Sequence, residues 1–227
     1  MPENRAFNRS MGRMAQEGVQ AVVDMGFLAA ATPVLARAPK GDGHTVVVLP
    51  GLGGDDRSTQ PLRGFLRSRG YDVRGWGLGR NLGPDRETRV GLAEALRSAY
   101  ARRREPVSLV GWSMGGVYAR ELAAAQPYAV RQVITLGSPV LGSIDVPSTS
   151  IFTRRDAIVP WRRSVLPAGP QSENIEVRAS HISLGHNPSV LYVVADRLAQ
   201  PVGTWAPFAP SGPAARWFPS DAGRRSA

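Results

Sequence analysis

Short apolar runs rich in β-branched residues recur along this chain and alternate with stretches in which apolar and polar helix-forming residues are mixed. Runs of this length, bounded by glycine, proline and polar residues, predict buried strands, and the stretches between them predict helices. The predicted strands are 45–49, 71–75, 106–110, 130–136, 148–153 and 174–178, and the predicted helices are 59–69, 87–104, 116–126 and 188–200. This alternation predicts an α/β fold with a doubly wound, mostly parallel sheet of about six strands.

Residues 111–115 have the sequence Gly-Trp-Ser-Met-Gly and lie between the predicted strand 106–110 and the predicted helix 116–126. The G-x-S-x-G pattern alone arises by chance, but a strand before it and a helix after it are the context of a nucleophile elbow. In that turn the backbone of the serine is strained, and a Cβ on either glycine would collide with the neighbouring strand or helix. We therefore predict that Ser113 is a nucleophile and not a serine on a surface turn.

Three histidines could supply the base that a serine nucleophile needs: His44, His181 and His186. In a hydrolase built on this elbow the partners follow in the order serine, acid, histidine, which excludes His44 and leaves it as a loop residue. His181 follows the predicted strand 174–178, on a loop at the carboxyl end of that strand. His186 adjoins the start of the last helix. We favour His181 as the base and expect His186 to be a solvated or helix-capping residue.

The acid of such a site should follow a strand between the serine and the histidine. Asp156 fits this position, because it comes directly after the predicted strand 148–153. Its role would be to accept the histidine N–H, fix the tautomer and stabilise the imidazolium. Asp145, in the loop before that strand, is the weaker alternative. Asp196 lies beyond His181 inside a predicted helix and is expected to be an ordinary surface charge or one that pairs within the helix.

Two backbone N–H groups are needed to bind a developing oxyanion. Met114 would give one from the first turn of the helix after the serine, where the helix dipole helps. Leu52 would give the other from the glycine-rich loop 50–54, which has neither a P-loop pattern nor a well-placed G-x-G-x-x-G and so does not predict a nucleotide site. The predicted substrate-binding residues are Gly51, Trp112 and Val159.

Taken in order, these motifs resemble the lipase and esterase branch of the α/β-hydrolase superfamily, specifically small bacterial hydrolases similar to triacylglycerol lipases. The resemblance covers residues from about 45 to about 200 and implies a Ser113, Asp156 and His181 triad, oxyanion donors at Leu52 and Met114, and carboxylic-ester substrates. It implies no metal and no organic cofactor. The Ser-His-x-x-Leu sequence also favours His181. The motifs that carry the resemblance are Leu-Pro-Gly-Leu-Gly-Gly at 49–54, Gly-Tyr-Asp-Val at 70–73, Gly-Trp-Ser-Met-Gly-Gly at 111–116, Leu-Gly-Ser-Pro at 136–139, Arg-Asp-Ala-Ile-Val-Pro at 155–160 and Ser-His-Ile-Ser-Leu at 180–184.

One stretch departs from that pattern. Such hydrolases commonly carry a helix or lid between the Leu-Gly-Ser-Pro strand and the acid strand. Here only the short segment 140–145 and the two residues after it separate Pro139 from the next predicted strand. A parallel crossover normally takes a dozen or more residues. Either the lid is reduced or absent, which would leave Ser113 open and remove lid-gated activation at interfaces, or one predicted strand is misplaced.

Charge and cysteine content narrow the partners only slightly. The chain has 28 basic and 18 acidic residues, a net charge of +10, and no cysteine, which excludes disulfides. The basic residues are nearly all arginine, with Lys40 the sole lysine, and they are scattered without an aromatic-interleaved platform. We therefore expect solvated faces, no nucleic-acid partner and a weak attraction to membrane surfaces. The oligomeric state stays open.

The two ends of the chain differ from its middle. Arg5, Arg9 and Arg13 precede an apolar run that superficially resembles a signal peptide, but Asp24 interrupts that run and Arg37 is a poor neighbour for cleavage. We favour an amphipathic helix docked on the domain or lying at a membrane interface. The expected organisation is a helical segment 1–40, a core 41–200 and an irregular tail 201–227, which is anchored by aromatics and frays after about residue 220. A cytoplasmic or peripheral membrane protein is expected, with secretion left open.

The sequence thus predicts a serine hydrolase that cleaves small-molecule or lipid carboxylic esters through an acyl-enzyme. Three alternatives stay open. One is an amidase or lipid-anchor deacylase, which a panel of substrates would distinguish. The same triad serves acyltransferases and thioesterases, which differ in the acceptor that competes with water. A membrane-surface binding protein with an idle triad would fail to react with an organophosphate at Ser113.

Overall fold

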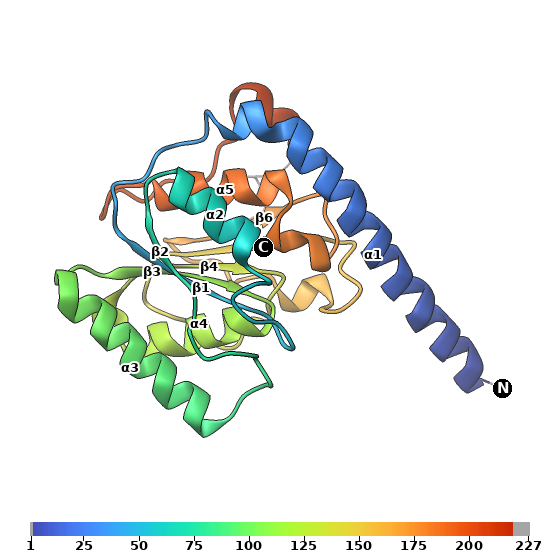
Figure 1. Cartoon of the computed structure of the whole chain (residues 1–227), viewed down its shortest axis with the longest axis horizontal. Helices are drawn as coiled ribbons and strands as arrows, with labels where there is room; N and C mark the ends of the chain where they lie inside the picture. The colour runs from blue at the N-terminus through green and yellow to red at the C-terminus, as the bar shows by residue number, and fades with distance from the viewer. Residues whose placement is uncertain (1, 220–227) are drawn as a thin grey trace.

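A six-stranded, all-parallel sheet forms the centre of the molecule in the computed structural model (Figure 1). The structure describes residues 2–219, and in the N-terminal helix it describes side chains from residue 17 onward. The strand order is β2-β1-β3-β4-β5-β6, so the chain winds first to one edge and then to the other. This confirms the predicted fold class. The strands are β1 Thr45–Leu49, β2 Asp72–Arg74, β3 Val107–Trp112, β4 Val130–Leu136, β5 Ser148–Phe152 and β6 Ser172–Glu176.

Helices cover both faces of the sheet because successive strand residues point to opposite sides. On β1, Val46 and Val48 belong to the core under one layer, whereas Val47 and Leu49 pack in the core under the other. The first layer contains α1, α2 and α5 and the second contains α3 and α4, as Figure 1 shows. The helices are α1 Pro2–Leu35, α2 Gln60–Ser68, α3 Arg86–Arg103, α4 Met114–Ala125 and α5 Pro188–Leu198, and the 3-10 turns are η1 Pro127–Ala129, η2 Trp161–Arg163, η3 Ile182–Gly185 and η4 Gly212–Trp217.

The last strand begins two residues earlier than its apolar run predicts. Ser172 pairs with Ser148, and Glu173 with Thr149, along the edge of the sheet. Backbone hydrogen bonds make this pairing, so polar residues can take part in it and an apolar pattern does not detect them. The strand therefore ends at Glu176, and the segment that carries His181 is correspondingly longer.

The crossover from β4 to β5 is a bare loop. Residues 137–147, all of them described, contain no helix, although the two strands are parallel neighbours. The loop is held by a hydrogen bond from the Val140 N–H to the Arg163 carbonyl (2.7 Å) and by another from Arg120 to the Gly142 carbonyl (2.6 Å). Both flanking strands lie where the sequence predicts them. The short connection is therefore a true feature of the fold and not the result of a misplaced strand.

The second half of α1 packs against α5 and η3, and its Ala31 and Leu35 belong to the main core. The stretch Glu17–Leu35 is long and apolar enough to cross a membrane by length and composition, with a mean hydropathy of 1.5. The C-terminal segment lies on the same layer, where Phe208, Trp217 and Phe218 are buried around Tyr192. Residues 220–227 of the expected tail lie outside the described residues.

Candidate active site

Ser113 occupies the turn between β3 and α4, as the sequence predicts. Its φ of 53° and ψ of −120° make it one of two non-glycine residues with positive φ in residues 2–219. A Cβ on Gly111 would lie 2.4 Å from the Gly116 backbone, and one on Gly115 would lie 2.2 Å from the Leu49 carbonyl oxygen. Backbone atoms cannot yield to such contacts. The two glycines therefore let strand, turn and helix approach closely enough to hold the serine in this strained conformation.

His181 and Asp156 form a buried pair. The His181 Nδ1 lies 2.7 Å from the Asp156 Oδ2, and both side chains are almost fully buried. The other carboxylate oxygen accepts the backbone N–H groups of Ile158 (2.9 Å) and Val159 (2.7 Å). Because the carboxylate only accepts, the network assigns the proton to Nδ1, which leaves Nε2 with a free lone pair. This is the tautomer that a general base needs.

The end of β4 brings the serine turn and the histidine pair together. The Ser113 N–H donates to the carbonyl of Leu136, the last residue of β4 (2.9 Å), and Leu136 is followed by Gly137. A Cβ on Gly137 would lie 3.0 Å from Asp156 Oδ2 and 3.2 Å from His181 Nδ1. Among the described residues the His181 side chain bonds only to Asp156, so its Nε2 makes no hydrogen bond to Ser113 Oγ; such bonds are often long until a substrate is bound. The three predicted residues therefore converge at the carboxyl ends of β3 and β4.

Two backbone N–H groups beside Ser113 have no acceptor among the described residues. A Cβ on Gly51 would lie 3.2 Å from Ser113 Cβ, so the loop after β1 passes directly beside the serine. Within residues 2–219 neither the Leu52 N–H nor the Met114 N–H has a hydrogen-bond acceptor. Met114 is also the first residue of α4, where the helix carries positive partial charge. That the Leu52 and Met114 N–H groups form an oxyanion hole stays a prediction.

Asn81, which the sequence analysis did not single out, holds that loop in place. Its side chain donates to the Pro50 carbonyl (2.9 Å) and accepts the Gly83 N–H (3.1 Å), and it is fully buried. Its backbone N–H donates to the Gly54 carbonyl (2.8 Å), and its carbonyl accepts the Gly53 N–H (2.7 Å). Nothing in the local sequence marks this residue, because its partners in the Leu52 loop lie about thirty positions away.

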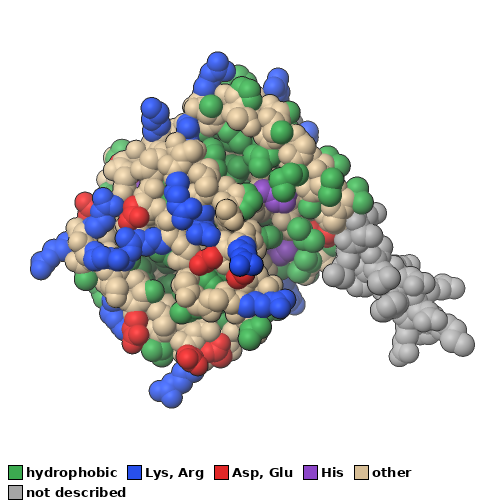
Figure 2. Space-filling model, in the orientation of Figure 1, with side chains coloured by type: hydrophobic (Ala, Val, Ile, Leu, Met, Phe, Trp, Pro, Cys, Tyr) green, Lys and Arg blue, Asp and Glu red, His purple; other side chains and the backbone are tan. Residues whose placement is uncertain are grey.

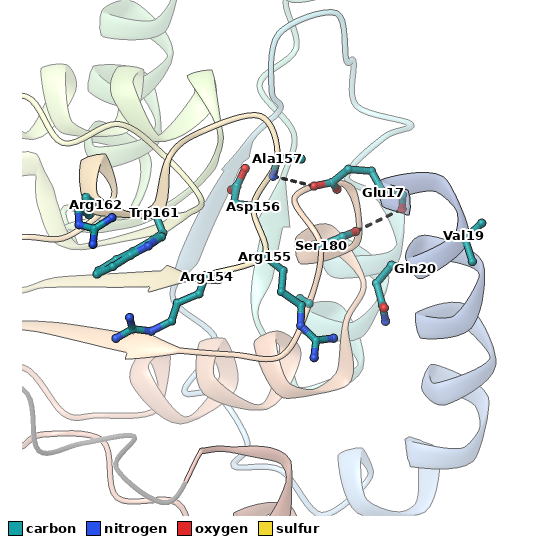
Figure 3. Close-up of a pocket in the computed structure, with 11 residues that line it drawn as sticks. Glu17, Val19, Gln20, Arg154, Arg155, Asp156, Ala157, Trp161, Arg162 and Ser180 are labelled. Atoms are coloured by element: carbon teal, nitrogen blue, oxygen red, sulfur yellow. Dashed lines mark hydrogen bonds between the residues drawn. The ribbon is translucent and has the colours of Figure 1, made fainter. Parts of the chain in front are cut away.

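Glu17 is a second residue that the sequence did not reveal. It lies on α1 and is 2% exposed, and its two carboxylate oxygens accept the backbone N–H groups of Ala157 and Ile182, each at 3.0 Å. These residues immediately follow Asp156 and His181. One side chain therefore joins the acid loop to the histidine loop, beside a hollow of about 960 Å³ (Figure 3). The available signal was the seven-residue spacing of Glu17 and Asp24, which places two acids on one face of an apolar helix.

The predicted substrate-binding residues have other contacts as well. The Trp112 indole N–H donates to the His181 carbonyl (3.1 Å), and the Val159 N–H donates to Asp156. Both residues therefore help to hold the histidine pair. Gly51 adjoins Ser113, as described above. Contact of these three residues with a substrate stays a prediction.

The alternative acids and base lie elsewhere. His186 is half-buried and its Nε2 lies 3.2 Å from the Ala21 carbonyl of α1, so it contributes to the docking of that helix. Asp145 is exposed on the β4–β5 loop, and Asp196 binds the neighbouring Arg197.

A similar row of side chains lies at the opposite, amino edge of the sheet. His44 Nδ1 bonds to Asp42, and His44 Nε2 lies 2.8 Å from Ser108 Oγ. Ser108 is 0% exposed, so no substrate can reach it. Burial lowers the pKa of His44, against the opposing effect of the Asp42 hydrogen bond. This row is a buried structural network that ties the start of β1 to the start of β3.

Residues 46–225 match the model of the family described as "Alpha/beta hydrolase family". A search of curated proteins found no match. One similar solved structure carries the description "LipS and LipT, two metagenome-derived lipolytic enzymes" and is 15% identical to this chain, with a TM-score of 0.56. The match covers 70% of this chain and 93% of that one. MGS-MChE2, an alpha/beta hydrolase enzyme from the sediment metagenome of the Mar Chica lagoon in Morocco, is 17% identical (TM-score 0.53; coverage 70% and 91%). Aspergillus fumigatus lipase B is 16% identical (TM-score 0.57; coverage 70% and 52%). At these identities the structures show the fold alone.

Proposed function

This chain belongs to the alpha/beta hydrolase family, and from that membership we propose that it is a serine hydrolase that cleaves carboxylic esters through an acyl-enzyme on Ser113. The observation that carries the proposal is the buried His181–Asp156 pair, which converges with Ser113 at the carboxyl ends of β3 and β4. Two N–H groups without acceptors among the described residues, on Leu52 and Met114, add the electrostatic part of the site.

In the proposed reaction Ser113 Oγ attacks the ester carbonyl carbon while its proton moves to His181 Nε2. The carbonyl oxygen becomes an oxyanion, which the Leu52 and Met114 N–H groups bind. The C–O bond to the alcohol then breaks, and the alcohol leaves with the proton from His181. Asp156 remains ionised throughout and stabilises the imidazolium.

Water completes the cycle. His181 takes a proton from a water molecule, whose oxygen attacks the acyl carbon. The second tetrahedral intermediate then releases the carboxylic acid, and Ser113 Oγ recovers the proton from His181. Added alcohols or thiols that compete with water for the acyl group would identify an acyltransferase working on the same residues.

The test uses two serines of the same strand–turn unit. Ser113→Ala should lower kcat for p-nitrophenyl esters by about 10⁴ to 10⁶-fold and abolish covalent labelling by a fluorophosphonate. Ser108→Ala is the matched control, because it removes the serine of the buried amino-edge row, and it should keep labelling and turnover. Turnover or labelling that survives Ser113→Ala would reject the proposed nucleophile.

A further inference from the structure

Between residues 17 and 25, helix α1 presents large apolar residues to solvent and its acidic residues to the protein. Glu17 and Asp24 are 2% and 3% exposed, whereas Val22 is 74% exposed and Val19, Val23 and Met25 are exposed as well. A helix on the surface of a soluble domain normally has the opposite arrangement. Figure 2 shows hydrophobic side chains gathered along the course that α1 takes in Figure 1. We call this exposed surface, formed by Val19, Val22, Val23 and Met25, the α1 apolar face.

Further exposed apolar residues lie on the loops around the candidate active site. Among the described residues thirteen large hydrophobic side chains are exposed, and ten of them lie either on α1 or on loops that follow the carboxyl ends of the strands. Single exposed hydrophobic residues need no explanation, but a group on one edge indicates a binding surface. The rim residues are Leu52, Leu78, Leu82, Leu141, Ile158 and Ile182.

Positive charge accompanies this surface. Arg154, Arg155 and Arg162 line the hollow beside α1, which Val19 of the apolar face also lines (Figure 3). All three arginines are exposed. Arg154 is paired with Glu176, and both Arg154 and Arg162 lie over the Trp161 ring. The chain as a whole carries +10. Basic groups beside an exposed apolar helix face are complementary to anionic lipid headgroups above an acyl layer.

We propose that the α1 apolar face and the site rim dock this protein on the surface of an anionic lipid bilayer, with the Ser113 edge turned toward the membrane. The proposal goes beyond the proposed hydrolysis, and α1 lies outside the residues that match the family. The docked protein would take its substrates from esters held in the bilayer.

The helix lies in the plane of the surface and does not span the bilayer. Its inward face is tied to the domain by Glu17, as described, and by Asp24, which accepts the Asn187 side-chain N–H at 3.0 Å. A spanning arrangement would break these bonds and place both carboxylates in hydrocarbon, which is costly. Docking in the plane keeps every one of these contacts and uses only the exposed side chains.

The experiment is sedimentation of the full-length chain with vesicles. Wild type should bind vesicles of phosphatidylcholine with about 30 mol% phosphatidylglycerol more strongly than phosphatidylcholine alone, and added salt should weaken the binding. The double variant V22E/V23E should lose at least about tenfold in partition coefficient. V202E is the control for an added negative charge elsewhere, to be compared with V22E alone, since Val202 is 72% exposed and lies near the starts of β4 and β5. It should bind as wild type does. Ser113→Ala should also bind as wild type does, which separates docking from catalysis.

Four outcomes would overturn the proposal. The first is that wild type does not bind vesicles, and the second is that its binding does not depend on anionic lipid or salt. The third is that V22E/V23E and wild type bind equally. The fourth is that binding by wild type resists both high salt and alkaline extraction, which is the behaviour of a spanning helix. If size-exclusion chromatography with light scattering shows a dimer that V22E/V23E dissociates, and wild type does not bind vesicles, the face is instead an interface between two copies. The lipid and salt series uses wild type alone, so it decides the matter even where a variant fails to fold.

Discussion

Replacing Glu17 by glutamine should slow the proposed reaction although Glu17 lies on a helix outside the hydrolase core. The side chain accepts one backbone N–H from the acid loop, at Ala157, and one from the histidine loop, at Ile182. A glutamine has one acceptor oxygen and one NH₂ group, so one of the two backbone N–H groups would face another donor. The variant keeps the shape of the side chain and changes only this hydrogen bonding.

The expected size of the effect follows from that single lost bond. A buried N–H left without an acceptor costs about 1–3 kcal/mol, which for a chain of this length lowers Tm by roughly 2–12 °C. Part of that energy can be recovered if the loop moves toward water, and the loop carries Asp156 or His181. A displacement of about 1 Å at a catalytic group can lower the rate about 100-fold, so we expect kcat to fall by about 10 to 100-fold.

Asp24→Asn is the matched control. Asp24 lies on the same face of α1, is equally buried and also accepts two hydrogen bonds, from Gln20 (2.9 Å) and Asn187 (3.0 Å). Thermal unfolding, kcat on a soluble p-nitrophenyl ester and the rate of fluorophosphonate labelling should be measured for both variants. Both should lose stability, but only Glu17→Gln should lose kcat and labelling rate. Equal kcat in the two variants would refute a positioning role for Glu17.

Three further predictions use other parts of the site. His181→Ala should lower kcat about as much as Ser113→Ala, and His186→Ala by less than about tenfold; the reverse order in ester assays would reassign the base. Asn81→Ala should free the Leu52 loop and lower kcat by about tenfold with a smaller change in KM, which steady-state kinetics would show; an unchanged kcat would contradict this. His44, whose pKa is lowered chiefly by burial, should make the chain less stable as pH falls below about 6.5, because the unfolded chain then binds the proton more readily. His44→Gln should flatten that fall in Tm, and a Tm that rises on acidification would contradict it.

The sheet and the elbow could be predicted from the sequence because their signals are local. A β-branched run such as 130–136 predicts a strand by itself, and the structure places β4 at Val130–Leu136. Ser113 could be predicted because its glycine neighbours are required by sterics within the same turn. Asp156 and His181 follow β5 and β6, so the parallel sheet alone brings them to one edge.

The supports of the site could not be predicted in this way. Glu17 contacts backbone groups about 140 and 165 positions away, and a backbone N–H carries no mark in the sequence. Gly137 has a φ of 54° and adjoins the acid and the histidine, but the sequence shows only a glycine after a strand. The orientation of α1 was equally hidden, because the apolar pattern suggests burial of the valines that the structure exposes.

The amino-edge row of Asp42, His44 and Ser108 has a consequence for where chemistry can occur in such a sheet. In a parallel sheet every strand has the same direction, so the helices before the strands end at one edge and the helices after them begin at the other. Ser108 lies near the end of α3, where carbonyl groups carry negative partial charge, and Ser113 lies at the start of α4, where N–H groups carry positive partial charge. An alkoxide or oxyanion would be repelled at the first position and attracted at the second. The direction of the chain thus gives the two ends of the sheet opposite partial charges. The same three side-chain types form a buried structural network at one end and are proposed to act in catalysis at the other.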